Sequence, residues 1–161
     1  MSAEAERRES LAALAASLKP GAFVLGLDLG TKTLGVAVAS LEVALAHPLD
    51  TIRRTKFTAD AERLAQIAAE REAAALILGL PLNMDGTEGP RAQSTRAFAR
   101  NLKPRLPLPL VFWDERLSTA AADDALEAAG VRSAKRGGVI DQAAAAAILQ
   151  SALDWLRSPR L

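Results

Sequence analysis

The clearest structural pattern in this chain lies in Phe23-Val24-Leu25-Gly26-Leu27-Asp28-Leu29-Gly30-Thr31-Lys32-Thr33-Leu34-Gly35-Val36-Ala37-Val38. Two apolar runs flank a Gly-Thr-Lys-Thr turn, which predicts a β-hairpin with strands over 22–28 and 33–40. The first strand ends in a single carboxylate, Asp28. Because an unpaired carboxylate is costly to bury, Asp28 is either a turn residue near solvent or a ligand in a site.

The rest of the chain alternates between short apolar runs and amphipathic segments. Further strands are predicted at 43–47, 75–79 and 110–113. Helices are predicted at 3–18, 57–71, 91–102, 118–129 and 140–156, with loops at 81–90 and 131–138. This order predicts an α/β fold with a mixed sheet covered by helices on both faces. We divide the chain into an N-terminal helical extension over 1–20 and one domain over 21–161.

The composition narrows the functional class. A length of 161 residues suits one domain, and the absence of Cys excludes disulfides and thiolate metal sites. With 20 basic and 19 acidic residues, the chain lacks the basic excess of many nucleic-acid binders, although a local basic face is enough. Aromatic residues make up only 4%, so a platform for stacking bases is hard to assemble. The sequence has neither a membrane-spanning run nor a signal-peptide pattern, which predicts a soluble cytoplasmic protein without membrane contact.

Acidic residues stand at the ends of predicted elements. Asp114 and Glu115 follow the strand at 110–113, and Asp141 opens the last helix. Because strand side chains alternate between the two faces of a sheet, only one of Asp114 and Glu115 can readily join Asp28. Asp141 shares a helical face with the apolar residues Ala145, Ile148, Ala152 and Trp155. Asp141 is therefore expected to point inward at the open end of this helix.

A cluster of carboxylates without Cys or His favours a hard cation, Mg²⁺ or Mn²⁺. The only histidine, His47, is remote from the acidic motifs, which argues against a His-based hydrolase. Each acid also has a structural interpretation by itself. Asp141 is equally an ordinary residue of a helix N-terminus, and Asp114 and Glu115 fit a solvated, ion-paired turn.

Basic and glycine-containing segments accompany the acids. The segment 30–33 resembles a phosphate loop but lacks the Walker spacing, so it either touches a phosphate or only turns the chain. Arg96, Arg100 and Lys103 fit a solvated helix face. Arg132, Lys135 and Arg136 lie in the predicted loop before Asp141, where a basic loop suits a polyanionic substrate.

Four motifs in order resemble those of the YqgF family, also called RuvX. They cover about residues 22–156 and are Gly26-Leu27-Asp28-Leu29-Gly30-Thr31-Lys32, Leu78-Gly79-Leu80-Pro81-Leu82-Asn83-Met84-Asp85-Gly86-Thr87, Asp114-Glu115-Arg116-Leu117-Ser118-Thr119 and the helix from Asp141 to Leu149. The resemblance implies an RNase H-like fold with a five-stranded mixed sheet, related to Holliday-junction resolvases. It also implies a nuclease that matures the 5′ end of pre-16S rRNA.

The resemblance assigns roles residue by residue. Asp28, Glu115 and Asp141 fall on the family's acidic positions, where they would hold one or two Mg²⁺ or Mn²⁺ ions. A water activated by the metal would then attack the phosphodiester in line. The expected substrate-binding residues are Gly30, Thr31, Lys32, Asn83, Arg116, Arg132, Lys135 and Arg136. Related resolvases use four acids, and the sequence identifies no fourth one here.

Three functional classes remain open at this point. The first is a nuclease acting on structured RNA or branched DNA, the latter requiring a two-fold homodimer. The second is a nucleic-acid-binding factor without catalysis. The third is a sugar-kinase-like or actin-like phosphotransferase, which is disfavoured because such enzymes need two related domains.

Overall fold

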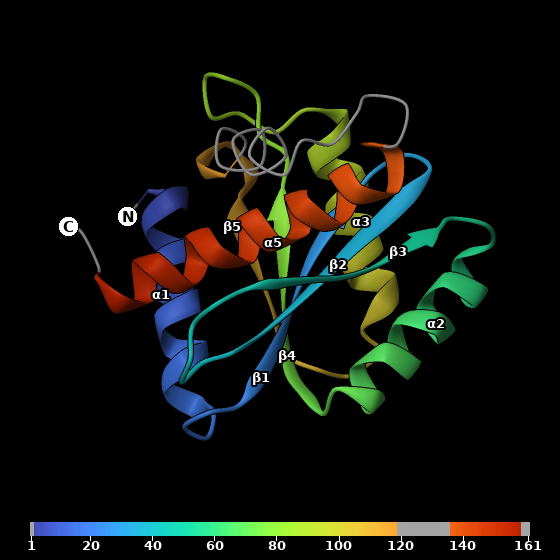
Figure 1. The fold of residues 1–161 in the computed structure, drawn as a ribbon. Coiled ribbons are helices and arrows are strands. Elements are labelled where there is room, and N and C mark those ends of the chain that lie inside the picture. Colours follow the sequence, from blue (N-terminus) through green and yellow to red (C-terminus); the bar gives the residue numbers. More distant parts are fainter. Residues whose placement is uncertain (1, 119–135, 159–161) are drawn as a thin grey trace.

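The computed structural model describes residues 2–118 and 136–158, the latter with side chains from Asp141 onward. These residues form a five-stranded sheet with the order β3-β2-β1-β4-β5 (Figure 1). The strands are β1 (Phe23–Leu29), β2 (Thr33–Ser40), β3 (His47–Arg53), β4 (Ala73–Leu80) and β5 (Leu110–Asp114). Strand β2 is antiparallel to β1 and β3, whereas β1, β4 and β5 are parallel. The predicted mixed sheet is thereby confirmed.

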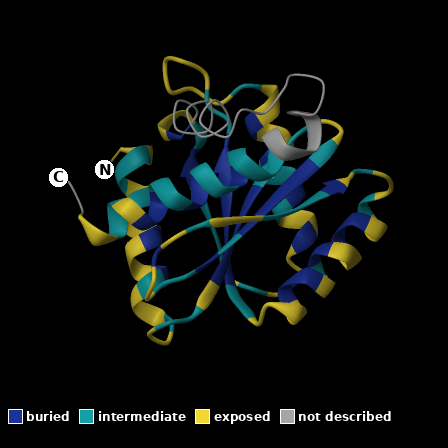
Figure 2. Cartoon of the chain, viewed as in Figure 1, coloured by how far each residue is buried: buried dark blue, intermediate teal, exposed yellow. Residues whose placement is uncertain are grey.

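Helices cover both faces of the sheet, as predicted. They are α1 (Ala3–Ser17), α2 (Phe57–Glu70), α3 (Pro90–Leu102) and α5 (Arg136–Arg157), and a short 3-10 helix, η1 (Glu115–Leu117), follows β5. Helices α1 and α5 contribute to one buried apolar cluster, and α2 and α3 to the other. Figure 2 shows the buried residues concentrated in the strands between these two layers.

Strand β4 shows why the sequence forms a sheet with two covered faces. Its residues are apolar without interruption, and those from Ala75 to Leu80 are all buried. Alternate side chains serve opposite layers. Leu76 and Leu78 pack with the α2 and α3 cluster, whereas Ala75 and Ile77 pack with the α1 and α5 cluster.

Helix α5 lies unusually close to the sheet because glycines face it. A Cβ atom at Gly26 would lie 2.6 Å from the Cβ of Leu149, and one at Gly35 would overlap the backbone carbonyl of Asp141. The start of α5 therefore rests directly on β2, and this contact sets the position of Asp141.

The N-terminal segment is part of this core. Leu11 of α1 is fully buried, and Leu14 is buried beside it in the cluster that α5 also joins. None of the helices in the described part of the chain is long and apolar enough to cross a lipid bilayer.

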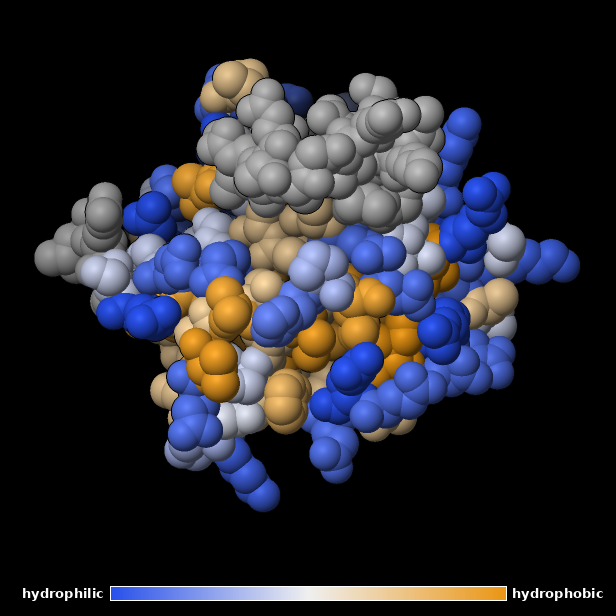
Figure 3. Space-filling model, viewed as in Figure 1, coloured by the Kyte–Doolittle hydropathy of each residue, from blue (hydrophilic) through white to orange (hydrophobic). Residues whose placement is uncertain are grey.

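Two predicted boundaries are wrong. The third strand spans His47–Arg53 rather than 43–47, and Val43 and Leu45 before it are 67% and 53% exposed. Among the described residues, strand β3 pairs with β2 alone and lies at the edge of the sheet. An edge strand tolerates polar residues and proline, and Pro48 and its polar neighbours hid this strand from the apolar pattern. Figure 3 shows apolar side chains on the surface of the face that carries α5.

The second wrong boundary concerns the last helix, whose backbone is helical from Arg136 rather than from residue 140. Residues 136–138 therefore belong to α5 and not to the preceding loop. The helix predicted at 118–129 lies outside the described residues from 119 onward, as does the loop from 131 to 135.

Candidate active site

The acidic residues meet at the edge of the sheet where the three parallel strands end. Leu27 of β1 is paired with Leu78 of β4, and Leu80 of β4 with Asp114 of β5. The residues that follow these positions, Asp28 and Glu115, therefore emerge at the same edge. Ligands of α/β proteins commonly bind at this edge, outside the carboxyl ends of the strands.

A side-chain hydrogen bond joins the carboxyl groups of Asp28 and Glu115. Burial, followed by the negative charges of Glu115 and Asp141, raises the pKa of Asp28 from 3.8 to about 7. Burial also raises the pKa of Glu115. Because burial and the neighbouring negative charges disfavour two ionised groups here, the pair favours holding one proton between the two carboxyl groups.

Asp141 adds a third carboxylate from the first turns of α5. Its Oδ2 accepts a hydrogen bond of 2.5 Å from Oγ1 of Thr33, the first residue of β2. Its charge contributes to the raised pKa of Asp28. The expected apolar stripe is also present, because Ala145, Ile148 and Ala152 are buried on the same face.

Asp114 and Glu115 separate as the alternation of strand side chains predicts. The carboxylate of Asp114 is buried and forms an ion pair of 2.8 Å with Nη2 of Arg116. It also accepts a hydrogen bond from the backbone amide of Arg116. Asp114 thereby caps η1 and is occupied structurally. Glu115, one residue later, is the acid that contacts Asp28.

The carboxylates of Asp28, Glu115 and Asp141 are the kind of ligand that a hard divalent cation favours. In this structure the three side chains do not point toward a common centre. Across residues 2–118 and 141–158, no group of three His, Cys, Asp or Glu side chains has the arrangement that holds a metal ion. Asp28 and Glu115 share a proton, and Asp141 is turned toward Thr33. A cation that replaced this proton would let both partly buried carboxylates ionise, which is the arrangement that Mg²⁺ and Mn²⁺ favour.

The turn that follows Asp28 is held by backbone hydrogen bonds. The amide of Gly30 donates to the carbonyl of Thr33 at 2.8 Å, and the amide of Arg54 donates to the carbonyl of Lys32 at 2.8 Å. Thr31 and Lys32 are exposed at the tip of this turn, beside the acidic edge.

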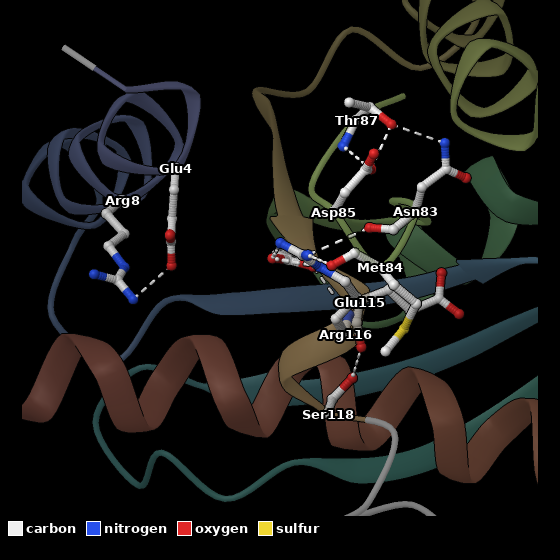
Figure 4. A network of polar contacts seen from close by, with 10 residues as sticks. Glu4, Arg8, Asn83, Met84, Asp85, Thr87, Glu115, Arg116 and Ser118 are labelled. Carbon is white, nitrogen blue, oxygen red and sulfur yellow. Dashed lines mark hydrogen bonds and ion pairs between the residues drawn. The ribbon is translucent and has the colours of Figure 1, made fainter. Parts of the chain in front are cut away.

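Asn83 and Arg116 organise the loop that follows β4 (Figure 4). Nδ2 of Asn83 donates to the Thr87 hydroxyl, which in turn donates to Asp85. Nη1 of Arg116 donates to the carbonyl oxygens of Asn83 and Met84 at 3.3 and 3.1 Å. Arg116 therefore ties this loop to the end of β5, and its role toward a substrate stays a prediction.

The basic segment before Asp141 can be located only in part. Arg132 and Lys135 lie outside the described residues, and Arg136 is the first residue of α5. Their roles toward a substrate also stay predictions.

The sequence analysis missed the cation that faces the acidic pair. The positive charge of Arg91 offsets part of the rise in the pKa of both Asp28 and Glu115. Arg91 follows Pro90, the first residue of α3. Proline at that position marks a helix start. This signal could have placed Arg91 in the first turn of the helix that follows β4, near the edge of the sheet where the acids lie.

Known proteins resemble this chain over nearly its whole length. The family model described as "RuvX: Holliday junction resolvase" matches residues 22–155. A protein of Paracoccus denitrificans named "Putative pre-16S rRNA nuclease" is 58% identical over 149 residues, covering 92% of this chain and 94% of the relative. A protein of the same name from Rhodopseudomonas palustris is 61% identical over 133 residues, covering 83% of each.

Solved structures share the fold at low sequence identity. RuvC of Thermus thermophilus in complex with a Holliday junction substrate superposes with a TM-score of 0.57 at 15% identity, covering 86% of this chain and 96% of RuvC. The yeast mitochondrial Holliday junction resolvase Ydc2 superposes with a TM-score of 0.56 at 14% identity, covering 98% and 87%. The expected RNase H-like fold is thereby confirmed.

Proposed function

Because this chain belongs to the RuvX family of Holliday junction resolvases, we propose that Asp28, Glu115 and Asp141 form the active site of a nuclease that depends on Mg²⁺ or Mn²⁺. The chain is a nuclease, which is a hydrolase acting on phosphodiester bonds. The observation that carries the site assignment is the hydrogen bond between the partly buried carboxyl groups of Asp28 and Glu115, with Asp141 close enough to raise the pKa of Asp28.

The residues of the chain divide the work of such a site. Asp28 and Glu115 would exchange their shared proton for a cation, and Thr33 keeps Asp141 oriented beside them. Bound Mg²⁺ or Mn²⁺ would stabilise the negative charge that develops on the phosphodiester and would lower the pKa of an attacking water. Asp114 and Arg116 fix the start of η1, and thus the position of Glu115.

The substrate we propose is the 5′ end of pre-16S rRNA, since closely related proteins of similar length carry that name. Such a substrate would place the protein in the cytoplasm. Thr31 and Lys32 are exposed beside the acidic edge, where they would contact the RNA backbone.

Branched DNA is the second candidate substrate, favoured by the family description as a Holliday junction resolvase. Cutting a four-way junction symmetrically requires two active sites, so this function would need a homodimer with two-fold symmetry.

The test compares cleavage of a pre-16S 5′ leader RNA, a single-stranded RNA and a four-way DNA junction in Mn²⁺ or Mg²⁺. We expect Asp28→Asn and Glu115→Gln to lower the cleavage rate at least about a hundredfold, because a metal contributes several kcal/mol of transition-state stabilisation. Asp154→Asn is the matched control, since Asp154 lies exposed on the same helix as Asp141.

Binding measurements separate catalysis from recognition. Asp28→Asn should still bind the substrate that the wild-type protein cleaves. A wild-type protein that cleaves none of the three nucleic acids with either metal, or an Asp28→Asn variant that cleaves at the wild-type rate, would contradict the proposed site.

A further inference from the structure

We propose that the cleft between the turn after β1 and the start of α3 binds a phosphate group of the substrate strand through Arg54 and Arg91. This inference rests on the proposed function, because it places one backbone phosphate of the nucleic acid beside the acidic edge. Neither arginine belongs to the residues that the sequence motifs assign to substrate binding.

The cleft has a volume of about 290 Å³ and lies next to the carboxylates. Its lining includes Gly30, Thr31, Arg54, Arg91, Ser94 and Thr95. Gly30 lies two residues beyond Asp28, so the two Cα atoms are within about 7 Å of each other. A nucleic-acid strand that lies across the acidic edge would therefore place the phosphate next to the cleaved one in this cleft.

The charge of the cleft matches an anion. Among the described residues that line it, two are basic and none is acidic. Two guanidinium groups around one small cleft repel each other unless an anion lies between them. Arginine presents several N–H donors in a planar fork, a geometry that suits phosphate oxygens.

Contacts within the protein hold the two arginines differently. Nη1 of Arg54 donates to the carbonyl of Gly30 at 2.6 Å, which orients its guanidinium over the turn. The Arg91 side chain forms no hydrogen bond or ion pair with the described residues, yet its charge offsets part of the rise in the pKa of Asp28 and Glu115. Arg91 is thus a cation that lies near the acidic pair, and its position in the lining of the cleft lets it contact an anionic group there.

Helix α3 adds donors of its own to this cleft. Pro90, its first residue, has no N–H, Gly89 provides no side-chain cap, and the amide of Gln93 donates to the Gly89 carbonyl at 3.1 Å. The amides of Arg91 and Ala92 therefore have no intrahelical acceptor. Such amides favour an anion. The Thr95 hydroxyl donates to the carbonyl of Arg91 at 3.0 Å, which leaves Ser94 and Thr31 as the hydroxyl donors of the cleft.

The test measures binding in the Asp28→Asn background, so that cleavage does not interfere. Fluorescein-labelled pre-16S 5′ leader RNA and a labelled four-way DNA junction are titrated at several salt concentrations. For whichever of the two probes the Asp28→Asn protein binds, we expect the added substitution Arg91→Gln to weaken binding roughly tenfold. The slope of log affinity against log salt should also become shallower by about one, since one phosphate contact is lost.

Two further variants of α3 sharpen the result. Arg91→Lys keeps the charge and should retain most of the salt slope. Arg100→Gln removes the same charge from the same helix but lines a different, largely apolar cleft of about 770 Å³, so it should bind as the Asp28→Asn protein does. Arg54→Gln should weaken binding like Arg91→Gln, and its melting temperature checks that loss of the contact to Gly30 leaves the fold intact.

The proposal is overturned if Arg91→Gln keeps the affinity and salt slope of Arg100→Gln, or if the protein binds neither probe. The proposed nuclease function fails separately, in the cleavage assay. Cleavage that is lost in Asp28→Asn but unchanged in Arg91→Gln would contradict only the proposed phosphate site. Binding that is weakened by Arg91→Gln, combined with no cleavage by the wild-type protein, would contradict only the proposed nuclease site.

Discussion

In the Asp28–Glu115 pair, a proton reduces the repulsion between the two carboxylates that a bound divalent cation would otherwise reduce. Two partly buried carboxylates in contact repel each other, so the protein without metal favours a state in which one of them is protonated. The same geometry becomes favourable for two ionised groups once a divalent cation lies between them. The raised pKa of Asp28 reflects burial first and the neighbouring negative charges second.

This pair makes the stability of the metal-free protein depend on pH. In the unfolded chain Asp28 ionises at its ordinary pKa of 3.8, whereas in the folded protein it keeps its proton up to about pH 7. As the pH rises between these values, only the unfolded state loses the proton, so folding becomes less favourable. The loss is complete above pH 7, and the difference between the two pKa values sets its upper limit at about 5 kcal/mol, from about 1.4 kcal/mol per pKa unit.

Thermal unfolding from pH 4 to 8 in a chelator measures this effect. The melting temperature of the wild-type protein should fall as the pH rises through this range, and that of Asp28→Asn should fall less. Parallel profiles for the two proteins would show that Asp28 does not carry a raised pKa.

Helix α5 brings the third carboxylate to the site through its contact with the sheet. Asp141 can reach the edge of β1 and β2 only because Gly35 leaves room for the helix backbone. A separate contact holds the second half of the helix, where Trp113 of β5 donates from Nε1 to the Ser151 hydroxyl at 3.0 Å. The element thus works as a rigid support for one side chain.

Two glycine substitutions test this contact. In Gly35→Ala the new methyl group meets the backbone of α5, which cannot move without displacing the helix. In Gly79→Ala it meets Cδ1 of Ile148 at 2.5 Å, the flexible end of a side chain. We expect Gly35→Ala to destabilise by about 3 kcal/mol or more and Gly79→Ala by about 1 kcal/mol.

Urea denaturation and the cleavage rate of the folded fraction report on both glycine variants. Gly35→Ala should lose activity beyond its loss of stability, because Asp141 moves with the helix. Equal effects of the two substitutions would contradict the close approach of α5 to β2.

The whole molecule depends on two apolar layers, and the N-terminal helix belongs to one of them. Helix α1 packs beside β5, while α5 covers the centre of the same face (Figure 1). Sheets of this type require both faces to be covered. The segment before the family motifs therefore contributes to the stability of the domain.

Leu11→Ala tests the contribution of α1. Leu11 is fully buried, so its truncation should destabilise by about 2–5 kcal/mol. Leu45→Ala is the matched control, because Leu45 is 53% exposed and should change stability by less than about 0.5 kcal/mol. Urea midpoints that are equal for both variants would show that α1 does not pack as described.

Local patterns in the sequence were sufficient for most of the fold. Alternation and helical periodicity record which face of each element is buried, and they predicted the strands around Asp28 and Asp114. The same alternation separated Glu115 from Asp114. It failed for β3, because an edge strand with one exposed face carries little apolar signal.

Only the tertiary structure decided which distant side chains meet. The contacts of Thr33 with Asp141 and of Arg116 with the Asn83–Thr87 loop join separate elements. Likewise, Arg54 and Arg91 come from different segments and line one cleft with Gly30. Periodicity describes a residue relative to its own element, whereas these contacts depend on how strands pair and helices cross the sheet. The sequence by itself therefore determined the fold class and predicted the acidic residues of the site, and the packing of the elements decided which side chains contact them.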